Sequence, residues 1–345
     1  MDTTADPEGL KGYSGVWVLG EQKAGVVQPI SFELLARARA LADIRRVPLT
    51  AVMLGRTGEE GLRDLIRRGA DRVLAVEAPE LEVFLPEPHA RTLEHLIRRH
   101  KPEILIAGAT STGRTLMPLV AVKCHAGLTA DCTSLAIEEG TGNLLQIRPA
   151  IGGNIMATIK SPAHRPQLAT VRPRSMKPAP ADPARTGEVV RETVPAELLR
   201  SRVRRLSFEG ASGTAGVNIE EADVVVSGGK GLKKRENMAL ILKLAEALHA
   251  GVGASRDAVD RGWIGYPHQV GLSGKTVSPK LYLCFGISGS IQHLAGIKTA
   301  ETIVAVNTNP EAQIFKVANF GIVGDLFEVI PALMRRLEQR RSRRK

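Results

Sequence analysis

The stretch Asp223-Val224-Val225-Val226-Ser227-Gly228-Gly229-Lys230-Gly231 decides the fold of the second half of the chain. Its three valines predict a short buried strand, and the glycines that follow allow a tight turn with room for a ligand beside the backbone. A helix is predicted from about 236 to 249, because leucine and isoleucine recur there at helical spacing. Strand, glycine loop and helix indicate a parallel α/β sheet whose ligand site lies at the carboxyl ends of the strands.

Three more loops of this kind follow within the same half of the chain. Two further strands are predicted at 281–285 and 302–306, and a last helix at 326–337. Any one glycine loop is more often an ordinary tight turn. Their clustering predicts a large phosphorylated ligand, because glycine lets backbone N–H groups approach an anion closely. The four loops are Ser227 to Gly231, Gly253 to Arg256, Gln269 to Lys275 and Gly286 to His293.

The first half of the chain alternates short β-branched runs with helical patterns, as a parallel sheet does. After the strand at 104–108, the residues Thr110 to Arg114 open a helix whose N-terminus is either an ordinary cap or an anion site. Strand-like runs between 128 and 171 predict an added antiparallel β layer. The predicted strands are 16–19, 49–54, 72–77, 104–108, 133–137, 144–148 and 155–160, and the predicted helices 31–43, 59–68 and 88–100.

Prolines at 173, 178, 180 and 183 interrupt any regular element, so we expect a linker over about 172–207. The fold class is therefore α/β with two domains. The first, residues 1–205, is a parallel-sheet α/β domain with an added β layer. The second, residues 208–334, is a doubly wound α/β domain, and residues 335–345 form a basic tail.

Composition narrows the class of protein. The chain has 345 residues and a formal charge of +11, of which the segment Arg335 to Lys345 supplies +6 through seven basic residues and Glu338. Such a run is either a solvated chain end or a docking site for an acidic partner. Aromatic residues make up 3% of the chain, which argues against base stacking and nucleic-acid binding.

Motifs of other functional classes are missing from the sequence. The three cysteines form no CxxC and have no histidine at metal-ligand spacing, so no metal site is predicted. There is no nucleophile elbow, no Walker motif and no GxGxxG with an acidic residue downstream. The acidic N-terminus and the lack of a long apolar run predict a cytoplasmic protein without a membrane span.

At the loops of the second domain the sequence resembles a known family. The runs Gln269 to Pro279 and Gly286 to Gly296 are similar to the signature of electron-transfer flavoprotein alpha subunits. The resemblance extends to Phe320–Leu326 and to Gly127–Cys132 and Gly152–Ala157 in the first domain, so it covers nearly the whole chain. It implies one FAD in the second domain, no catalytic acid, base or nucleophile, and electron transfer between other redox proteins.

The resemblance also implies the residues of the site. Ser255 would bond the pyrophosphate region, Arg256 would lie near the isoalloxazine, and the hydroxyl of Ser273 would reach flavin N5. His293 would lie at the flavin N1/O2 edge, where an imidazole donor or cation stabilises negative charge on the reduced flavin. The cofactor-binding residues implied are Gly229, Lys230, Gly231, Ser255, Arg256, Gln269, Val270, Gly271, Leu272, Ser273, Gly274, Ser288, Gly289, Ser290, Ile291, Gln292, His293, Asn307, Asp325 and Leu326.

Three positions depart from the family pattern. Lys230 stands where arginine is usual, Leu272 where glutamine is usual, and Asn319 where aspartate is more common. Lysine keeps the charge but loses the bidentate fork. These departures keep a second hypothesis open, a nucleotide-binding scaffold subunit without redox function. An NAD-dependent enzyme is a further alternative, since the architecture is shared, but no catalytic base is identified.

The family resemblance implies partners as well. Family members work as heterodimers with a beta subunit that carries AMP or, in electron-bifurcating members, a second FAD. We expect the first domain to pack against that subunit and the FAD domain to rotate on the linker. Electrons would enter from a flavin-dependent dehydrogenase and leave to a second carrier such as ferredoxin or a quinone oxidoreductase. Similarity of the first-domain segments favours a bifurcating type.

Overall fold

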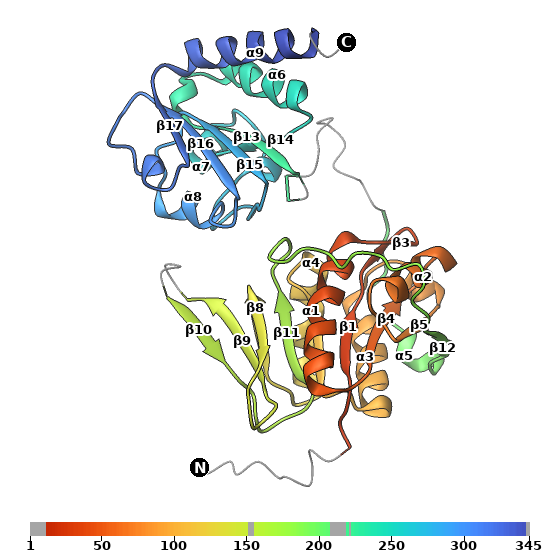
Figure 1. Ribbon diagram of the computed structural model, residues 1–345. Coiled ribbons are helices and arrows are strands. Elements are labelled where there is room, and N and C mark those ends of the chain that lie inside the picture. The colour runs from red at the N-terminus through yellow and green to blue at the C-terminus, as the bar shows by residue number, and fades with distance from the viewer. Residues whose placement is uncertain (1–11, 151–154, 208–218, 221, 343–345) are drawn as a thin grey trace. The chain divides into compact units, whose positions relative to one another are not determined.

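The computed structural model describes residues 12–150, 155–207, 219–220 and 222–342 (Figure 1). The chain divides into two compact units, Met1–Ser207 and Phe208–Lys345. Part of the expected Gly152–Ala157 motif, the acidic N-terminus and the last three residues of the basic tail lie outside the described residues. Within the described part of the chain, no helix has both the length and the apolar character needed to cross a membrane.

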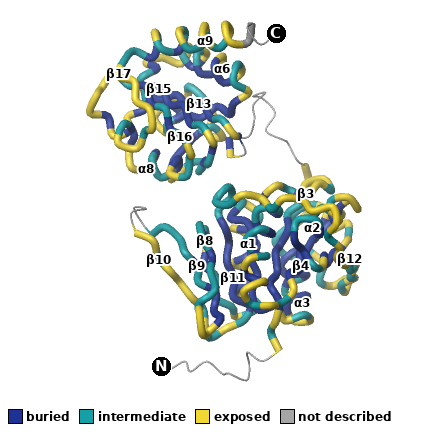
Figure 2. Tube along the Cα trace, viewed as in Figure 1, coloured by how far each residue is buried: buried dark blue, intermediate teal, exposed yellow. Residues whose placement is uncertain are grey.

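The first unit is built on a seven-stranded sheet in the order β12-β5-β4-β1-β6-β11-β7, with every neighbouring pair parallel. Its inner strands are buried on both faces, as in the dark tube segments at β4 and β11 in Figure 2, whereas the edge strands β7 and β12 are partly exposed. The sheet strands are β1 Val16–Leu19, β4 Leu49–Leu54, β5 Arg72–Val76, β6 Ile104–Gly108, β7 Leu128–Cys132, β11 Gln167–Val171 and β12 Glu188–Arg191.

Helices cover both faces of this sheet. Val16 and Val18 of β1 pack with the helices α1 and α2, whereas Trp17 and Leu19 pack with α3 and α4. Alternate residues of a strand point to opposite faces, so β1 contributes side chains to two apolar cores. The remaining elements of the unit are β2 Gln22–Lys23, β3 Val26–Val27, α1 Pro29–Arg45, α2 Glu59–Arg67, a 3₁₀ turn Pro79–Leu81, α3 Pro86–His100, α4 Ser111–Lys123 and α5 Ala196–Leu199.

The predicted antiparallel layer is present as a separate three-stranded sheet in the order β10-β9-β8. Its strands are β8 Ser134–Ile137, β9 Leu144–Pro149 and β10 Met156–Ile159. Thr110 caps α4 by accepting a hydrogen bond from the backbone N–H of Gly113, so that helix opens with an ordinary N-cap.

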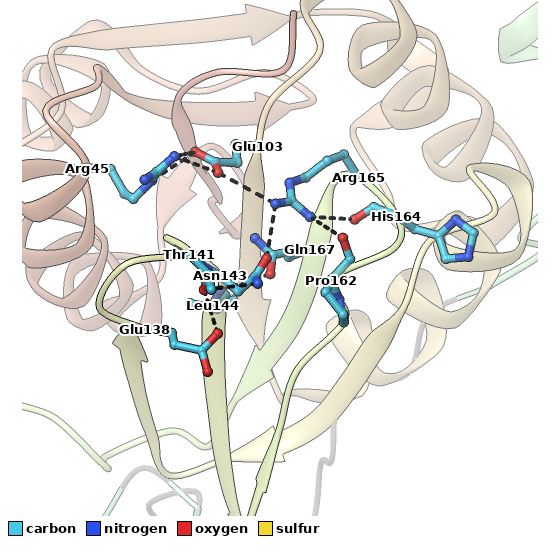
Figure 3. Close-up of polar contacts among 10 residues, drawn as sticks. All are labelled: Arg45, Glu103, Glu138, Thr141, Asn143, Leu144, Pro162, His164, Arg165 and Gln167. Carbon is cyan, nitrogen blue, oxygen red and sulfur yellow. Dashed lines mark hydrogen bonds and ion pairs between the residues drawn. The ribbon is translucent and has the colours of Figure 1, made fainter. Parts of the chain in front are cut away.

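A buried polar cluster ties this added sheet to the parallel one (Figure 3). Arg45 at the end of α1 donates to both carboxylate oxygens of Glu103, which is only 5% exposed. Arg165 lies 3.9 Å from the same carboxylate and donates to Oδ1 of Asn143 at 3.2 Å. Gln167 of β11 accepts from the backbone N–H of Leu144 in β9. The cluster therefore joins elements of both sheets through charge-assisted bonds.

The segment 172–207 differs from the expected linker, because much of it packs on the first unit. The backbone N–H of Ala179 bonds to the carbonyl of Phe32, and Arg185 pairs with Asp71 at 2.7 Å. Farther on, β12 adds to the edge of the sheet beside β5. Proline removes hydrogen-bond donors but does not prevent an extended segment from lying against a surface. The segment 172–207 therefore belongs to the first unit, which ends at Ser207, and rotation of the second unit on it stays a prediction.

The second unit is a five-stranded parallel sheet in the order β14-β13-β15-β16-β17. The helices α6 and α9 pack on the face that carries Val226, and the opposite face carries Val225 and Tyr282. Its elements are β13 Val224–Gly228, α6 Met238–Leu248, β14 Gly251–Ala254, α7 Arg256–Asp260, β15 Leu281–Phe285, α8 Ile291–Ala295, β16 Thr302–Asn307, β17 Phe320–Val323, α9 Leu326–Ser342, and 3₁₀ turns at Lys230–Leu232, Arg235–Asn237, Tyr266–His268 and Gln313–Lys316.

Both units have the α/β fold class expected from the sequence. The expected strand at 224–226 continues to Gly228, and the expected final helix continues to Ser342. Most of the expected basic tail is therefore part of α9. We attribute the longer helix to the helix-favouring leucine, glutamate, glutamine and arginine residues of this region.

Candidate cofactor site

A pocket of about 390 Å³ lies at the carboxyl edge of the second sheet. It is formed by the segments that follow β13, β14 and β15, together with the loop at 269–273. Parallel α/β sheets bind ligands at this edge. The lining residues are Lys230, Ser255, Arg256, Asp257, Asp260, Gln269, Val270, Gly271, Leu272, Ser273, Gly286, Ile287, Ser288, Gly289, Ser290, Gln292 and His293.

Glycine is required where two of these loops touch. A Cβ on Gly229 would stand 2.4 Å from the carbonyl oxygen of Gly286. A Cβ on Gly231 would stand 2.6 Å from the Cα of Gly286. The N–H of Gly231 also bonds to the carbonyl of Gly286 at 3.0 Å. Gly286 itself has a φ of +64°, which favours glycine. The loops after β13 and β15 are therefore held together through their backbones.

Ser273 is held by two neighbours at the pocket wall. The buried Gln269 donates from Nε2 to Oγ of Ser273 at 3.1 Å, and the hydroxyl of Tyr266 donates to its carbonyl oxygen at 2.9 Å. A hydroxyl that accepts one hydrogen bond still has its own proton to donate. The side chain of Ser273 can therefore present an O–H donor to a ligand.

His293 is the most buried ionisable side chain of the pocket wall, with 5% of its surface exposed. Its Nε2 lies 2.9 Å from the hydroxyl of Tyr282, which in turn donates to Oγ of Ser227 at 2.7 Å. Burial lowers the pKa of His293 to about 4, although the backbone of Val270 opposes part of that shift. The ring is therefore neutral near pH 7, and its Nδ1 is buried without a hydrogen-bond partner of normal geometry.

Charged side chains stand at the outer part of the pocket. Lys230 is exposed, and Arg256 lies on α7 with its Nε 3.2 Å from Asp260. The neighbouring Asp257 pairs in the same way with Arg261. The pairs are solvent-exposed and therefore weak, so the cations can turn to an anionic ligand at little cost.

The structure brings most of the expected site residues to one wall, and a few lie outside it. Asn307 donates to the carbonyl of Ile287, and Leu326 packs at Gly286, so both support lining residues from behind. Asp325 accepts from the backbone N–H of Phe327 at the start of α9. The expected residues that do not line the pocket are Gly229, Gly231, Gly274, Ile291, Asn307, Asp325 and Leu326.

Several positions in or behind the pocket wall are not among the expected cofactor-binding residues, although Ser227, Gly286 and Ile287 belong to the predicted glycine loops. Asp257 and Asp260 line the pocket because they share α7 with Arg256, and this could have been inferred from their helical spacing. Gly286 and Ile287 line it directly after β15. Tyr282 and Ser227 lie behind His293 on neighbouring strands, and their contact depends on strand order, which has no signal in the sequence.

The three departures from the family pattern differ in their position relative to the pocket. Lys230 lines the pocket, and Leu272 lines it with 75% of its surface exposed. Asn319 lies outside the lining, and its Oδ1 accepts from the backbone N–H of Ile303 at 2.8 Å. The side chain of Asn319 therefore ties β16 to the residue that precedes β17.

The pocket fits a flavin dinucleotide by its chemistry. A buried imidazole nitrogen without a partner and a serine hydroxyl with a free proton suit the polar edge of a flavin ring. Lys230 and Arg256 offer charges for a diphosphate. The loops are closely packed glycine segments, and such segments let backbone N–H groups approach an anion.

The fold and the pocket define a two-domain α/β protein of the kind that binds nucleotide cofactors. Residues 16–197 match the family model described as the electron transfer flavoprotein domain, and residues 218–298 match the one described as the electron transfer flavoprotein FAD-binding domain. The chain belongs to the family of electron transfer flavoprotein alpha subunits. Its second unit is thus an FAD-binding domain, and its function is electron transfer.

Curated relatives agree with this assignment. An electron transfer flavoprotein subunit alpha of Thermoanaerobacterium thermosaccharolyticum is 47% identical over 330 residues, which is 96% of this chain and 99% of the relative. Protein FixB of Clostridium saccharobutylicum is 43% identical, and the match covers 94% of this chain and 96% of that protein. The subunit LctC of a lactate dehydrogenase (NAD(+),ferredoxin) of Acetobacterium woodii is 38% identical, covering 94% of this chain and 77% of its own.

Proposed function

We propose that FAD lies in the pocket of the second unit with its flavin ring against the wall formed by Ser273 and His293. The observation that carries this proposal is that Ser273 and His293 line the same pocket as the cations Lys230 and Arg256, at the carboxyl edge of a parallel sheet. The diphosphate lies toward Lys230, Ser255 and Arg256, where charge is available.

Each side chain has a separate task in this arrangement. Ser273 donates its hydroxyl proton to the ring. Gln269 donates a hydrogen bond to the same hydroxyl oxygen, which leaves the hydroxyl proton directed away from Gln269. Arg256 adds positive charge, which favours electron-rich states of a bound cofactor. FAD supplies the redox chemistry when bound, and the protein sets its potential and exposure.

The chain acts with other proteins in this proposal. It pairs with a beta subunit through its first unit, and that subunit carries AMP or a second FAD. Electrons enter from a flavin-dependent dehydrogenase and leave to a second carrier such as ferredoxin or a quinone oxidoreductase. The relatives' designation as subunits supports the pairing.

Electron bifurcation is a second candidate, favoured by one observation. The Acetobacterium woodii relative is named as a subunit of a lactate dehydrogenase (NAD(+),ferredoxin), so its name joins two redox carriers. A protein that serves both needs a second flavin, which the beta subunit would hold. Bifurcation and simple transfer therefore differ in flavin content.

The test is co-purification of this chain with its beta subunit, followed by a visible spectrum and quantification of released nucleotides. One FAD and one AMP per heterodimer would support simple electron transfer, and two FAD would support bifurcation. A colourless heterodimer that takes up no added FAD would refute the proposal and favour the scaffold hypothesis.

A further inference from the structure

A run of exposed cations follows the loop after β13. Lys230, Lys233, Lys234 and Arg235 lie within one short segment, and only Lys230 among them lines the pocket. The other three are exposed, and none of them forms an ion pair within the part of the chain that the structure describes. The arginines of α7, by contrast, pair with aspartates one turn away. The charge of these three side chains is therefore available to a partner.

The backbone of this loop is closely held and strained. Lys233 has a φ of +66° and a ψ of −40°, and the N–H of Lys234 donates to the carbonyl oxygen of Leu232 at 2.7 Å. These values describe a γ-turn with a positive φ at its centre, a rare and strained form for a residue other than glycine. Strain of this kind is retained mainly at functional sites. The Nζ of Lys233 lies 5.3 Å from the centre of the Phe327 ring, so the loop is also held to α9.

The outer face of α9 carries further cations. Leu333, Met334 and Leu337 pack toward α6, which leaves Arg335 and Arg336 exposed, and Figure 2 shows exposed segments along this helix. We call the exposed cations of the loop and of α9 together the basic surface. Its members are Lys233, Lys234, Arg235, Arg335, Arg336 and Arg340, and the exposed acids on the same two elements are Glu236, Glu328 and Glu338.

We propose that the basic surface is the docking site of an acidic electron-carrier protein. The proposal rests on the proposed function, since a carrier exchanges electrons only with a redox protein. Charge complementarity selects the occupant, because carboxylates of the carrier would pair with cations that have no ion-pair partner among the described residues. The position indicates a redox role, because the loop starts at Lys230, whose side chain lines the pocket. A carrier bound to the loop therefore lies beside the cofactor site.

The experiment measures the affinity of the heterodimer, co-purified with its beta subunit, for a ferredoxin of net negative charge at about 50 mM and about 500 mM salt. The test variant is Lys234→Glu/Arg235→Glu, which keeps the γ-turn at Lys233. The matched control is Arg56→Glu/Arg63→Glu, which changes the net charge equally at exposed cations of the first unit. At low salt we expect the test variant to bind about tenfold more weakly and the control to change by less than about threefold. The difference should shrink at high salt.

Equal losses of affinity in the test and control variants would overturn the proposal, because they would show that net charge alone governs binding. A test variant that binds as tightly as the unchanged heterodimer would overturn it too. So would an unchanged heterodimer that binds vesicles of phosphatidylglycerol but not ferredoxin. If the test variant does not fold, Arg335→Glu/Arg336→Glu is measured against the same control.

Flavin absorbance separates this result from the proposed function. A colourless heterodimer that binds ferredoxin through the basic surface refutes the cofactor assignment and leaves the docking site standing. A flavin-loaded heterodimer whose affinity for ferredoxin does not depend on the basic surface refutes only the docking site.

Discussion

His293 makes the stability of the second unit depend on pH in a direction that its burial determines. Its pKa is about 4 in the folded chain, against an ordinary value of 6.5, because burial disfavours the charged ring. The unfolded chain therefore binds a proton at higher pH than the folded chain does. The stabilising contribution is fully present above about pH 6.5 and is lost as the pH falls toward 4.

The size of this effect follows from the two pKa values. One pKa unit corresponds to about 1.4 kcal/mol, so lowering the pH from 7.5 to 5 costs about 2 kcal/mol through His293. The perturbation is His293→Gln, which removes the titrating group. We expect the unchanged chain to lose about 2 kcal/mol more than the variant over this pH range.

The assay is urea unfolding of the cofactor-free chain at pH 7.5 and pH 5, followed by circular dichroism. Other titrating groups, including His89 with its pKa also lowered to about 4 by burial, are common to both proteins and cancel in the difference. Equal losses of unfolding free energy in the two proteins would refute the reasoning, since they would mean that His293 is not desolvated in the folded chain.

Three further predictions concern the pocket and the first unit. Lys230→Ala should weaken FAD binding about tenfold, because it removes a charge-assisted contact with the diphosphate; fluorescence titration at two salt concentrations would show whether the loss shrinks with salt. Ser273→Ala should weaken binding about threefold to tenfold whereas Ser273→Thr should keep it, and equal affinities would contradict a role for the hydroxyl. Glu103→Ala should cost about 3 kcal/mol of unfolding free energy by leaving Arg45 and Arg165 without their buried partner, and a loss under about 1 kcal/mol would show that the cluster is well hydrated.

The regular elements could be predicted because each carries its own local pattern. The valine run of β13 and the spaced leucines of α6 specify their structure without reference to the rest of the chain. The short strand β12 could not be predicted, because Glu188–Arg191 has two valines between charged residues and follows a proline-rich stretch. Its place in the sheet depends on pairing with β5, which is far away in the sequence.

Some residues of the candidate site could be predicted from the sequence and others could not. The glycine loops and His293 are identifiable from sequence because residue type and spacing carry the chemistry. Tyr282 was missed because its contact with Ser227 arises from the order of strands β13 and β15. Asn319 shows the opposite case, in which a position that the resemblance suggested for the site serves to join two strands.

The position of β12 matters to anyone who wishes to produce the first unit alone. A truncation near residue 172, where the prolines begin, would remove this strand and expose the backbone of β5 along a stretch of apolar side chains. Unpaired edges of that kind bind one another, so such a fragment should aggregate. A fragment that ends at residue 207 keeps β12 paired with β5. We therefore expect the longer fragment to stay in solution and the shorter one to aggregate.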